Sequence, residues 1–293
     1  MRAMQGEAVI IGNPASGRVS MRKLKQCAEM LDRSGIRAEI WPTERPEHAT
    51  ELATLAGARL VVAAGGDGTI NEVINGLHRD ARLGILPLGT ANVLARELGI
   101  PLNLERACRR ILAGEAVRID LGIARNASGV ERRFACMAGI GFDASVVLAV
   151  TPGIKRRLRR TAFALMAFKV FLTSEIPPFE VFCGGERRRV RFAIVANGRN
   201  YGGDFWSAEH ASLTNGRLEV VLVERVRSLL RPDILAHILA KRPLSRRMPS
   251  VSVPRVEASP LGNAVVPVQL DGEAWGQLPM SFRVEPSALA VLR

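Results

Sequence analysis

Apolar residues in the first 120 positions follow two alternating patterns, short continuous runs and longer segments with an apolar residue every three or four positions. The short runs have the length and composition of buried strands. They lie at residues 7–11, 36–41, 59–64 and 83–87. The segments that follow them, such as 21–33, 46–55 and 69–77, are predicted helices. Strands that alternate with helices predict an α/β domain with a parallel sheet.

The pattern changes from about residue 118 to β-runs that are separated by glycine, with few helices between them. This change predicts a second domain, a mostly antiparallel β-sandwich. We expect domain boundaries at 1–120 and 121–283, with the tail at about 284–293 packing back onto the first domain. A nucleotide site is expected in the cleft between the two domains.

Two glycine-containing segments of the second domain have specific expectations. The segment 179–195 has Gly184 and Gly185 at its middle and is predicted to form one hairpin. The string GIGFDA at 139–144 resembles a dinucleotide fingerprint, but no helix followed by an acid at the required spacing is predicted after it. We therefore expect a packed turn of the sandwich there.

The first domain is organised around the turn GGDG at Gly65, Gly66, Asp67 and Gly68, which joins a predicted strand to a predicted helix. Glycines allow positive φ, and the first amides of a helix have no partner within it and attract anions. The turn is a candidate phosphate cradle, although such turns also occur for structural reasons alone. A carboxylate beside bound phosphate requires a cation such as Mg²⁺ between them. The first helical turn continues with Thr69, Ile70, Asn71 and Glu72.

Other loops with small, hydroxyl or amide residues follow the neighbouring strands. In parallel α/β sheets, ligands bind outside the carboxyl ends of the strands, so these loops are expected to form one site. They contain Asn13, Pro14, Ala15, Ser16 and Gly17 after the first strand, Thr43 after the second, and Thr90 and Asn92 after the fourth. The first of these loops is not a Walker A motif, because Arg18 and Val19 stand where that motif has Lys and then Ser or Thr.

A second group of acids lies near the C-terminus in the string DGE. A strand that ends there would place Asp271 and Glu273 on the same side of the pleat, and paired acids suit metal binding or proton abstraction. The alternative is a solvated hairpin tip with Asp271 and Gly272 as turn residues.

Composition limits the classes of function. The chain has 293 residues, 47% of them hydrophobic, which is enough for a full core. Its four cysteines form no C-x-x-C pair, which argues against a disulfide scaffold or a zinc site and favours a reducing compartment. The N-terminal residues lack a signal-peptide layout, and the longest apolar stretch, 162–168, is too short to span a membrane. We expect a cytoplasmic protein.

The formal net charge of +13 indicates a polyanionic partner. With one Tyr, three Trp and no basic module interleaved with aromatic residues, the sequence gives little support to nucleic-acid binding. An anionic membrane surface is the better fit.

The predicted helix 154–172 carries an apolar stripe that includes Phe168 and Leu172, and its first turns are basic. The basic residues are Lys155, Arg156, Arg157, Arg159 and Arg160. Such a helix suits peripheral attachment to the inner face of the membrane, although it could instead pack onto the core.

The string GGDGT followed by INEV at 65–73 resembles the lipid kinase family typified by bacterial diacylglycerol kinase and sphingosine kinase. The loop NPASG at 13–17, Thr43 with the following pair His48-Ala49, and the DGE at 271–273 also match that family. The resemblance implies ATP and Mg²⁺ as cofactors and a lipid substrate. It assigns nucleotide binding to the loops described above, the role of base to Glu273, and orientation of the hydroxyl or metal binding to Asp271.

The chain departs from the family's pattern at two positions. Many relatives have an aspartate after the Asn of GTAN, where this chain has Val93, so no role of that aspartate carries over. The family's segment for a structural Mg²⁺ corresponds to Leu213, Asn215 and Leu218, with Asn215 in the place of an aspartate. A neutral amide is a poorer Mg²⁺ ligand than a carboxylate.

The sequence therefore predicts an ATP-dependent kinase of a lipid hydroxyl, such as that of diacylglycerol. Two alternatives stay open: a kinase of a soluble substrate similar to NAD kinase, and a catalytically silent protein that binds nucleotide or lipid. A homodimer is also left open.

Overall fold

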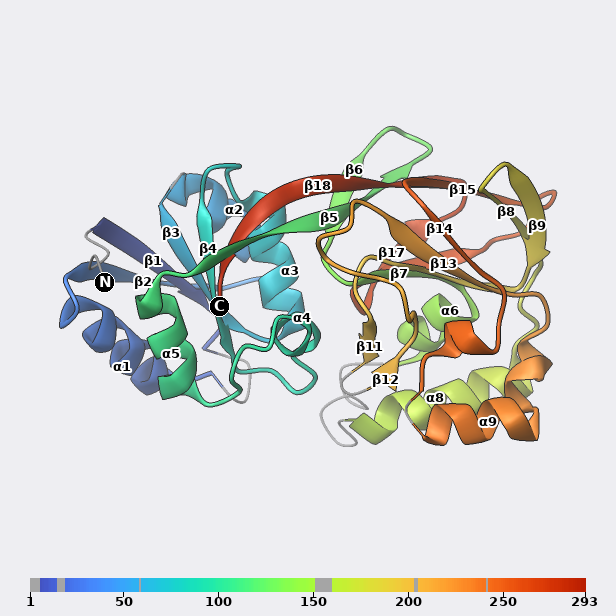
Figure 1. Cartoon of the computed structure of the whole chain (residues 1–293), viewed down its shortest axis with the longest axis horizontal. Coiled ribbons are helices and arrows are strands. Elements are labelled where there is room, and N and C mark those ends of the chain that lie inside the picture. The colour runs from blue at the N-terminus through green and yellow to red at the C-terminus, as the bar shows by residue number, and fades with distance from the viewer. Residues whose placement is uncertain (1–5, 15–18, 58, 151–159, 203–204, 241) are drawn as a thin grey trace. The chain divides into compact units, whose positions relative to one another are not determined.

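The computed structural model describes residues 6–14, 19–57, 59–150, 160–202, 205–240 and 242–293 (Figure 1). The chain divides into two compact units, one of Met1–Asp120 with Ser287–Arg293 and one of Leu121–Pro286. The predicted fold class is confirmed, since the first unit is α/β with parallel strands and the second is built from antiparallel sheets.

The first unit contains a parallel sheet in the order β2-β1-β3-β4, continued by the end of β18. The strands are β1 (Gly6–Gly12), β2 (Ile36–Pro42), β3 (Leu60–Gly65), β4 (Arg82–Pro87) and β18 (Met280–Leu292). β3 is buried along its whole length, as expected for a strand covered on both faces. The last residues of β18 pair with the start of β4 in parallel, Ala290 with Arg82 and Val291 with Leu83.

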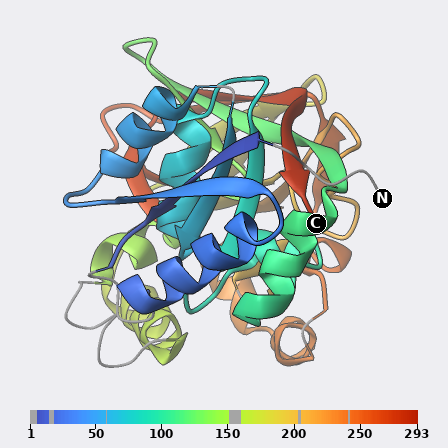
Figure 2. The same ribbon diagram turned by 90° about the vertical axis from the view of Figure 1, so that its left-hand side faces the viewer.

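Helices cover both faces of this sheet (Figures 1 and 2). They are α1 (Met21–Asp32), α2 (His48–Ala56), α3 (Asp67–Gly76), α4 (Val93–Glu97) and α5 (Leu104–Ala113). α1 packs with α5, and α2 packs with α3. Right-handed crossovers explain why the helices lie on two faces. The connection from β1 to β2 through α1 and the connection from β2 to β3 through α2 run in opposite directions along the sheet, so α1 and α2 lie on opposite faces. The sheet thus has a topological switch point between β1 and β3, where α/β proteins bind ligands.

The second unit packs two antiparallel sheets face to face. One sheet has the order β9-β8-β15-β18-β5-β6, formed by β9 (Glu186–Val190), β8 (Phe179–Cys183), β15 (Arg255–Pro260), the first part of β18, β5 (Ala116–Asn126) and β6 (Glu131–Phe134). The other has the order β14-β13-β10-β7-β16-β17, formed by β14 (Ser250–Val253), β13 (Leu218–Val223), β10 (Phe192–Ala196), β7 (Met137–Gly141), β16 (Pro267–Leu270) and β17 (Glu273–Gln277).

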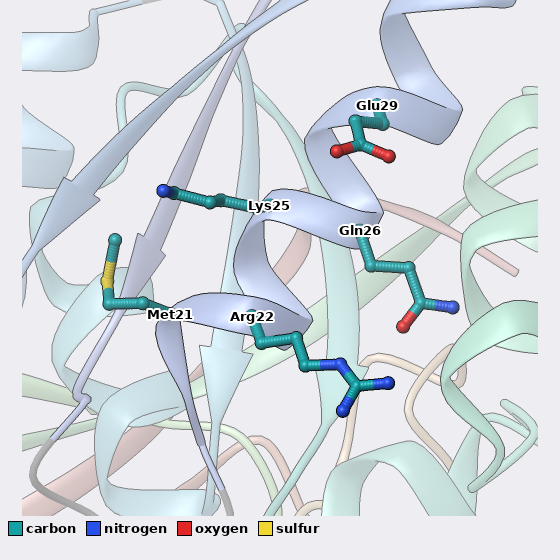
Figure 3. A pocket seen from close by; sticks show the side chains of 5 residues that line it. All are labelled: Met21, Arg22, Lys25, Gln26 and Glu29. Carbon is teal, nitrogen blue, oxygen red and sulfur yellow. The ribbon is translucent and has the colours of Figure 1, made fainter.

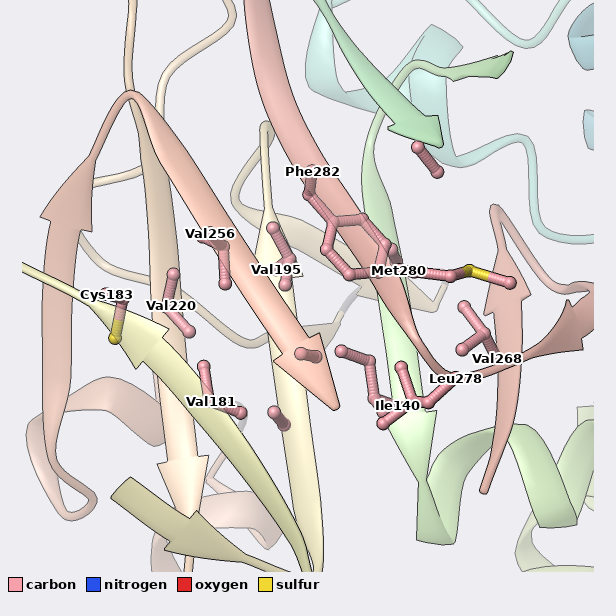
Figure 4. Close-up of a cluster of buried hydrophobic side chains, with 14 of the residues drawn as sticks. Ile140, Val181, Cys183, Val195, Val220, Val256, Val268, Leu278, Met280 and Phe282 are labelled. Carbon is pink, nitrogen blue, oxygen red and sulfur yellow. The ribbon is translucent and has the colours of Figure 1, made fainter. Parts of the chain in front are cut away.

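The core of the second unit lies between these sheets (Figure 4). Ile140, Val195 and Val220 come from one sheet, and Val256 and Phe282 come from the other. The remaining elements are α6 (Phe142–Ala149), α8 (Arg160–Thr173), β11 (Asn200–Gly202), β12 (Phe205–Trp206), η1 (Val226–Leu230), α9 (Pro232–Leu239) and η2 (Leu244–Arg246).

Two predictions for the second unit were wrong. The segment 179–195 is not one hairpin: β8 and β9 pair around Gly184 and Gly185, but β10 belongs to the other sheet, between β7 and β13. The residues of β10 are all buried, which agrees with the central place of this strand in its sheet. GIGFDA is not a turn either, because β7 ends at Gly141, where φ is +79°, and α6 begins at Phe142.

The predicted helix at 154–172 corresponds in part to α8, while residues 154–159 lie outside the described part of the chain. Among the residues of α8 whose side chains are described, 166–173, Met166 and Val170 are buried and pack with Val146 of α6. Phe168 and Leu172, members of the predicted apolar stripe, are 59% and 63% exposed. At these two positions the stripe does not face the core.

Gly122→Ala is expected to destabilise the second unit by about 1–3 kcal/mol, because a Cβ at this position would lie 2.1 Å from the ring of Phe134. The two residues pair directly across β5 and β6. Urea denaturation measures the loss. In a Phe134→Leu background the same substitution should cost less, because the smaller side chain leaves room. An equal loss in both backgrounds would contradict this packing.

Candidate active site

The register of the parallel strands brings the predicted loops of the first unit to one edge of the sheet. Gly12 at the end of β1 pairs with Pro42 of β2 and Ala64 of β3, and Gly65 pairs with Pro87 of β4. The loops that start there contain Asn13 and Pro14, Thr43, Gly66 to Thr69, and Thr90 and Asn92. Ala15, Ser16 and Gly17 lie outside the described residues.

Hydrogen bonds and close backbone packing connect these loops. The amide of Thr43 donates to the carbonyl of Gly12 at 2.9 Å, and the amide of Leu88 donates to that of Gly65 at 2.9 Å. The loops after β3 and β4 also touch through glycines, since a Cβ on Gly89 would lie 2.4 Å from the Cα of Gly66. The loops therefore meet through their backbones, an arrangement that suits close approach of phosphate oxygens to amide groups.

Asp67 is the first residue of α3, and its carboxylate joins two of these loops. One carboxylate oxygen accepts from the amide of Asn92 at 2.9 Å, and the other accepts from the amide of Val93 at 2.6 Å. Asn92 has a φ of +51°, and its Oδ1 accepts from the amide of Gly89 at 2.9 Å. Asp67 thus caps α4 in addition to any role with a ligand. Val93 contributes its backbone amide to this cap.

The predicted residues on the first turn of α3 point in different directions. Ile70 and Asn71 are buried, and the Nδ2 of Asn75 donates to both the carbonyl and the Oδ1 of Asn71. The carboxylate of Glu72 accepts from the amide of Ala49 at the start of α2, at 3.2 Å. Glu72 and Ile70 therefore contribute to the packing of the unit, whereas the GGDGT backbone faces the loop cluster.

The DGE string of the second unit forms a tight hairpin turn. Leu270 pairs with Glu273 across β16 and β17, which leaves Asp271 and Gly272 as a two-residue loop with φ values of +48° and +86°. Positive φ at both positions is the requirement of a type I′ turn. The prediction that Asp271 and Glu273 share one side of the pleat was wrong, because the strand ends at Leu270 and the turn redirects Asp271.

The carboxylate of Asp271 accepts hydrogen bonds from consecutive backbone amides. Its Oδ2 accepts from Ala135 at 2.6 Å, and its Oδ1 accepts from Cys136 and from Met137, both at 2.9 Å. The amide of Asp271 in turn donates to the carbonyl of Met137 at 2.9 Å. The turn is therefore tied at this point to the segment that leads into β7.

Glu273 is reachable from solvent and is paired with an arginine. Its Oε2 lies 3.0 Å from an Nη of Arg132 on β6, and the Glu273 and Arg132 side chains are 38% and 17% exposed. A carboxylate that is held in place and still accessible suits acceptance of a proton from a substrate.

A network behind the turn was not foreseen from the sequence. Gln269, Asp143 and the hydroxyl of Tyr201 are connected by hydrogen bonds, and Gln269 also contacts the turn. Burial raises the pKa of Asp143 to about 7, because the carboxylate loses its hydration.

Asp120, a buried acid of β5 that accepts a hydrogen bond from the amide of Ser287 at 2.8 Å, was also not predicted from the sequence. Gln269 could have been noticed as a polar residue within an apolar strand run. Nothing in the sequence indicated that Arg132 would pair with Glu273.

The segment that resembles a structural Mg²⁺ site of the family has an amide in place of the carboxylate, at Asn215. Asn215 is exposed, and its amide is already used: Nδ2 donates to the carbonyl of His210 at 3.2 Å, and Oδ1 accepts from the amide of Arg217 at 3.0 Å. The side chains of Leu213 and Leu218 are buried. Within the described ranges, His, Cys, Asp and Glu side chains form no cluster of three that could hold a metal.

A nucleotide-bound Mg²⁺ has different requirements. Proteins hold it through one or two carboxylates together with the phosphates of the substrate. The Asp67 carboxylate, fixed at the edge where the loops meet, fits that chemistry.

A surface hollow lies along α1 (Figure 3). Its lining residues, Met21, Arg22, Lys25, Gln26 and Glu29, belong to that one helix. None of the residues predicted for the site is among them, so the hollow is not part of the loop cluster.

Comparisons with known proteins match both units. Residues 7–124 match the family model described as diacylglycerol kinase catalytic domain, and residues 136–293 match the model described as YegS C-terminal NAD kinase beta sandwich-like domain. The chain is 29% identical over 291 residues to a diacylglycerol kinase of Bacillus subtilis (strain 168), with 94% of this chain and 92% of the relative covered. It is 33% identical over 249 residues to a probable lipid kinase YegS-like of Chromohalobacter salexigens, covering 82% of this chain and 77% of the relative.

The fold is also found in a solved structure. The crystal structure of a diacylglycerol kinase from Bacillus anthracis str. Sterne superposes with a TM-score of 0.79 at 21% identity, covering 98% of this chain and 96% of that chain. At this identity the likeness supports the fold. In the part of the chain that the structure describes, no helix has the length and apolar character needed to cross a membrane.

Asp271→Asn is expected to lower the free energy of unfolding by about 1–3 kcal/mol, because an amide group has one acceptor oxygen and its NH₂ would face a backbone donor. Chemical denaturation measures this loss. Asp233→Asn is the matched control, since Asp233 is exposed and paired with Arg231 at the surface, and should change stability by about 0–1 kcal/mol. Equal stability of the two variants would contradict the structural role of Asp271.

Proposed function

The chain belongs to the lipid kinase family of diacylglycerol kinase and YegS, and we propose that it transfers the γ-phosphoryl group of ATP to a hydroxyl of a lipid such as diacylglycerol. The observation that carries the proposal is the loop cluster of the first unit, in which Asp67 ties the GGDGT loop to the loop after β4. This arrangement offers backbone amides to phosphates and one fixed carboxylate beside them.

In this proposal the first unit binds the nucleotide. The amides of Gly66, Gly68 and Thr69 hold phosphate oxygens at the start of α3. The loops with Asn13, Pro14, Ala15, Ser16 and Gly17, with Thr43, and with Thr90 and Asn92 complete the site. Asp67 holds the metal ion, and Mg²⁺, when bound, neutralises the charge of the triphosphate.

The second unit supplies the base. Glu273 takes the proton of the lipid hydroxyl at its carboxylate, and Arg132 holds that carboxylate in one orientation. The hydrogen bonds of Asp271 to residues 135–137 favour a positioning role for this residue, which sets the turn before Glu273.

The proposed lipid substrate requires access to a membrane surface, and α6 and α8 offer a candidate for contact with it. Leu148 of α6 and Phe168 and Leu172 of α8 are 58%, 59% and 63% exposed, and the two helices pack together. The basic residues Lys155, Arg156, Arg157 and Arg159 precede α8 in the sequence and lie outside the described residues. We propose that this part of the chain binds the anionic inner face of the membrane from the cytoplasm. The net charge of +13 favours this attachment.

The two alternative functions differ from this one in measurable products. A kinase of a soluble substrate would label NAD or another water-soluble alcohol, and a silent binder would bind ATP without turnover. Mass spectrometry of total membrane lipids after incubation with enzyme, ATP and Mg²⁺ identifies the acceptor. Label that stays in the aqueous phase, or no transfer at all, would overturn the lipid kinase proposal.

Glu273→Gln is expected to lower phosphate transfer from labelled ATP into chloroform-extractable lipid by at least about 100-fold, because the amide cannot accept the proton. The variant should fold normally and bind ATP as before. Glu257→Gln is the matched control, an exposed glutamate beside Arg255 on β15, and should keep its activity. Turnover of Glu273→Gln close to that of the unsubstituted protein would remove Glu273 from the mechanism.

The double substitution Phe168→Gln with Leu172→Gln is expected to reduce flotation of the protein with vesicles that contain anionic lipid by at least about threefold, because it removes apolar surface that can enter the bilayer interface. Leu55→Gln on α2 is the control, since Leu55 is 72% exposed on a helix of the other unit. Flotation that is unaffected by the double substitution, or equally reduced by Leu55→Gln, would exclude this surface.

A further inference from the structure

A chain of hydrogen bonds runs through the interior of the second unit and ends on the turn before Glu273. The Oε1 of Gln269 accepts from the amide of Gly272 at 2.7 Å, and its Nε2 donates to the Oδ2 of Asp143 at 2.6 Å. The hydroxyl of Tyr201 donates to the other carboxylate oxygen of Asp143. Gln269 and Asp143 are only 1% and 8% exposed.

The neighbouring strand leaves space for this chain at a glycine. A Cβ on Gly139 of β7 would lie 1.9 Å from the Oδ2 of Asp143 and 2.5 Å from the Nε2 of Gln269. Gly139 and Asp143 both belong to the GIGFDA string at 139–144. This string therefore places the Asp143 carboxylate on the first turn of α6. It also has a glycine at position 139, where any larger side chain would clash with that carboxylate.

The arrangement is costly for a purely structural core. Burial raises the pKa of Asp143 to about 7, which shows that its ionised form is disfavoured there. Buried charged groups in proteins can often be replaced by well-packed apolar residues of similar volume without loss of stability. Gln269 and Asp143 differ from apolar residues in forming directional hydrogen bonds. The hydrogen bond from the amide of Gly272 to Gln269 fixes one particular backbone geometry of the turn.

Both residues of the turn, Asp271 and Gly272, form hydrogen bonds that fix its position. The carboxylate of Asp271 is bound by the amides of residues 135–137, and the amide of Gly272 is bound by Gln269. With only these two residues in the loop, the two attachments determine where β17 begins, and β17 begins with Glu273.

From this geometry we propose that Gln269 and Asp143 are positioning residues of the kinase, which hold the turn so that the carboxylate of Glu273 meets the substrate hydroxyl. The inference rests on the proposed function of Glu273. Gln269 acts directly on the turn, Asp143 orients the amide of Gln269, and Tyr201 orients Asp143. None of these side chains is assigned a contact with the substrate.

The test uses Gln269→Met in the full chain, because Met has a similar length and cannot form either hydrogen bond. We expect kcat for lipid phosphorylation to fall about tenfold, since small displacements of a catalytic group have effects of this order. The KM for ATP should stay within about twofold, since nucleotide binding is assigned to the first unit. Gln277→Met, an exposed glutamine on β17, is the matched control and should leave kcat unchanged.

A second background separates positioning from general structural damage. In Glu273→Gln, where the base is already absent, Gln269→Met should cause no further loss of transfer. An equal fold loss in both backgrounds would overturn the proposal, because it would mean that Gln269 acts independently of Glu273. Asp143→Asn should retain most of the activity that Asp143→Ala loses, since an asparagine oxygen can still accept from Gln269.

Hydrogen–deuterium exchange of the peptide 267–277 tests the positioning without any substrate. Gln269→Met should raise the exchange rate of this peptide at least about tenfold, and Gln277→Met should not. Unchanged exchange overturns the positioning role, whereas faster exchange in a protein without lipid transfer supports positioning and overturns the proposed function instead. If Gln269→Met does not fold, Tyr201→Phe removes one bond of the chain and should give a smaller loss with the same dependence on Glu273.

Discussion

Carboxylates bound by backbone amides are the interaction on which both units depend. Asp67 accepts from the amides of Asn92 and Val93, and Asp271 accepts from those of residues 135–137. Charge-assisted hydrogen bonds of this kind are stronger than neutral ones. Each carboxylate joins segments that are far apart in the sequence, so each loop is fixed by a distant part of the chain rather than by its own local preferences.

Glycine makes these attachments sterically possible. In the first unit, Gly66 and Gly89 let the loops after β3 and β4 come together, because a Cβ on Gly89 would lie 2.4 Å from the Cα of Gly66. In the second unit, Gly272 takes a φ of +86° in the turn, and Gly139 leaves space for Asp143 and Gln269. The same residues that mark loops in the sequence thus determine which side chains can approach the loops.

Much of the fold could be predicted because it depends on local patterns. The parallel sheet of the first unit followed from apolar runs that alternate with amphipathic helices, since buried strands and one-faced helices leave distinct periodicities. The loops with Asn13, Thr43, Asp67 and Asn92 could be grouped because strand ends of a parallel sheet share one edge. The position of β10 could not be predicted, since an apolar run does not show which of two sheets it joins.

The sequence alone was sufficient for the class of fold, the glycine-aspartate loop and the presence of acids at Asp271 and Glu273, because residue type and spacing carry that information. The directions in which those acids point depended on the tertiary structure. Asp271 turns toward residues 135–137, Glu273 pairs with Arg132, and Gln269 connects to Asp143 across more than 120 positions of sequence. Hydrogen bonds between such distant residues form only once the strands that carry or flank them have come together in the folded unit, so no local pattern of side chains records them.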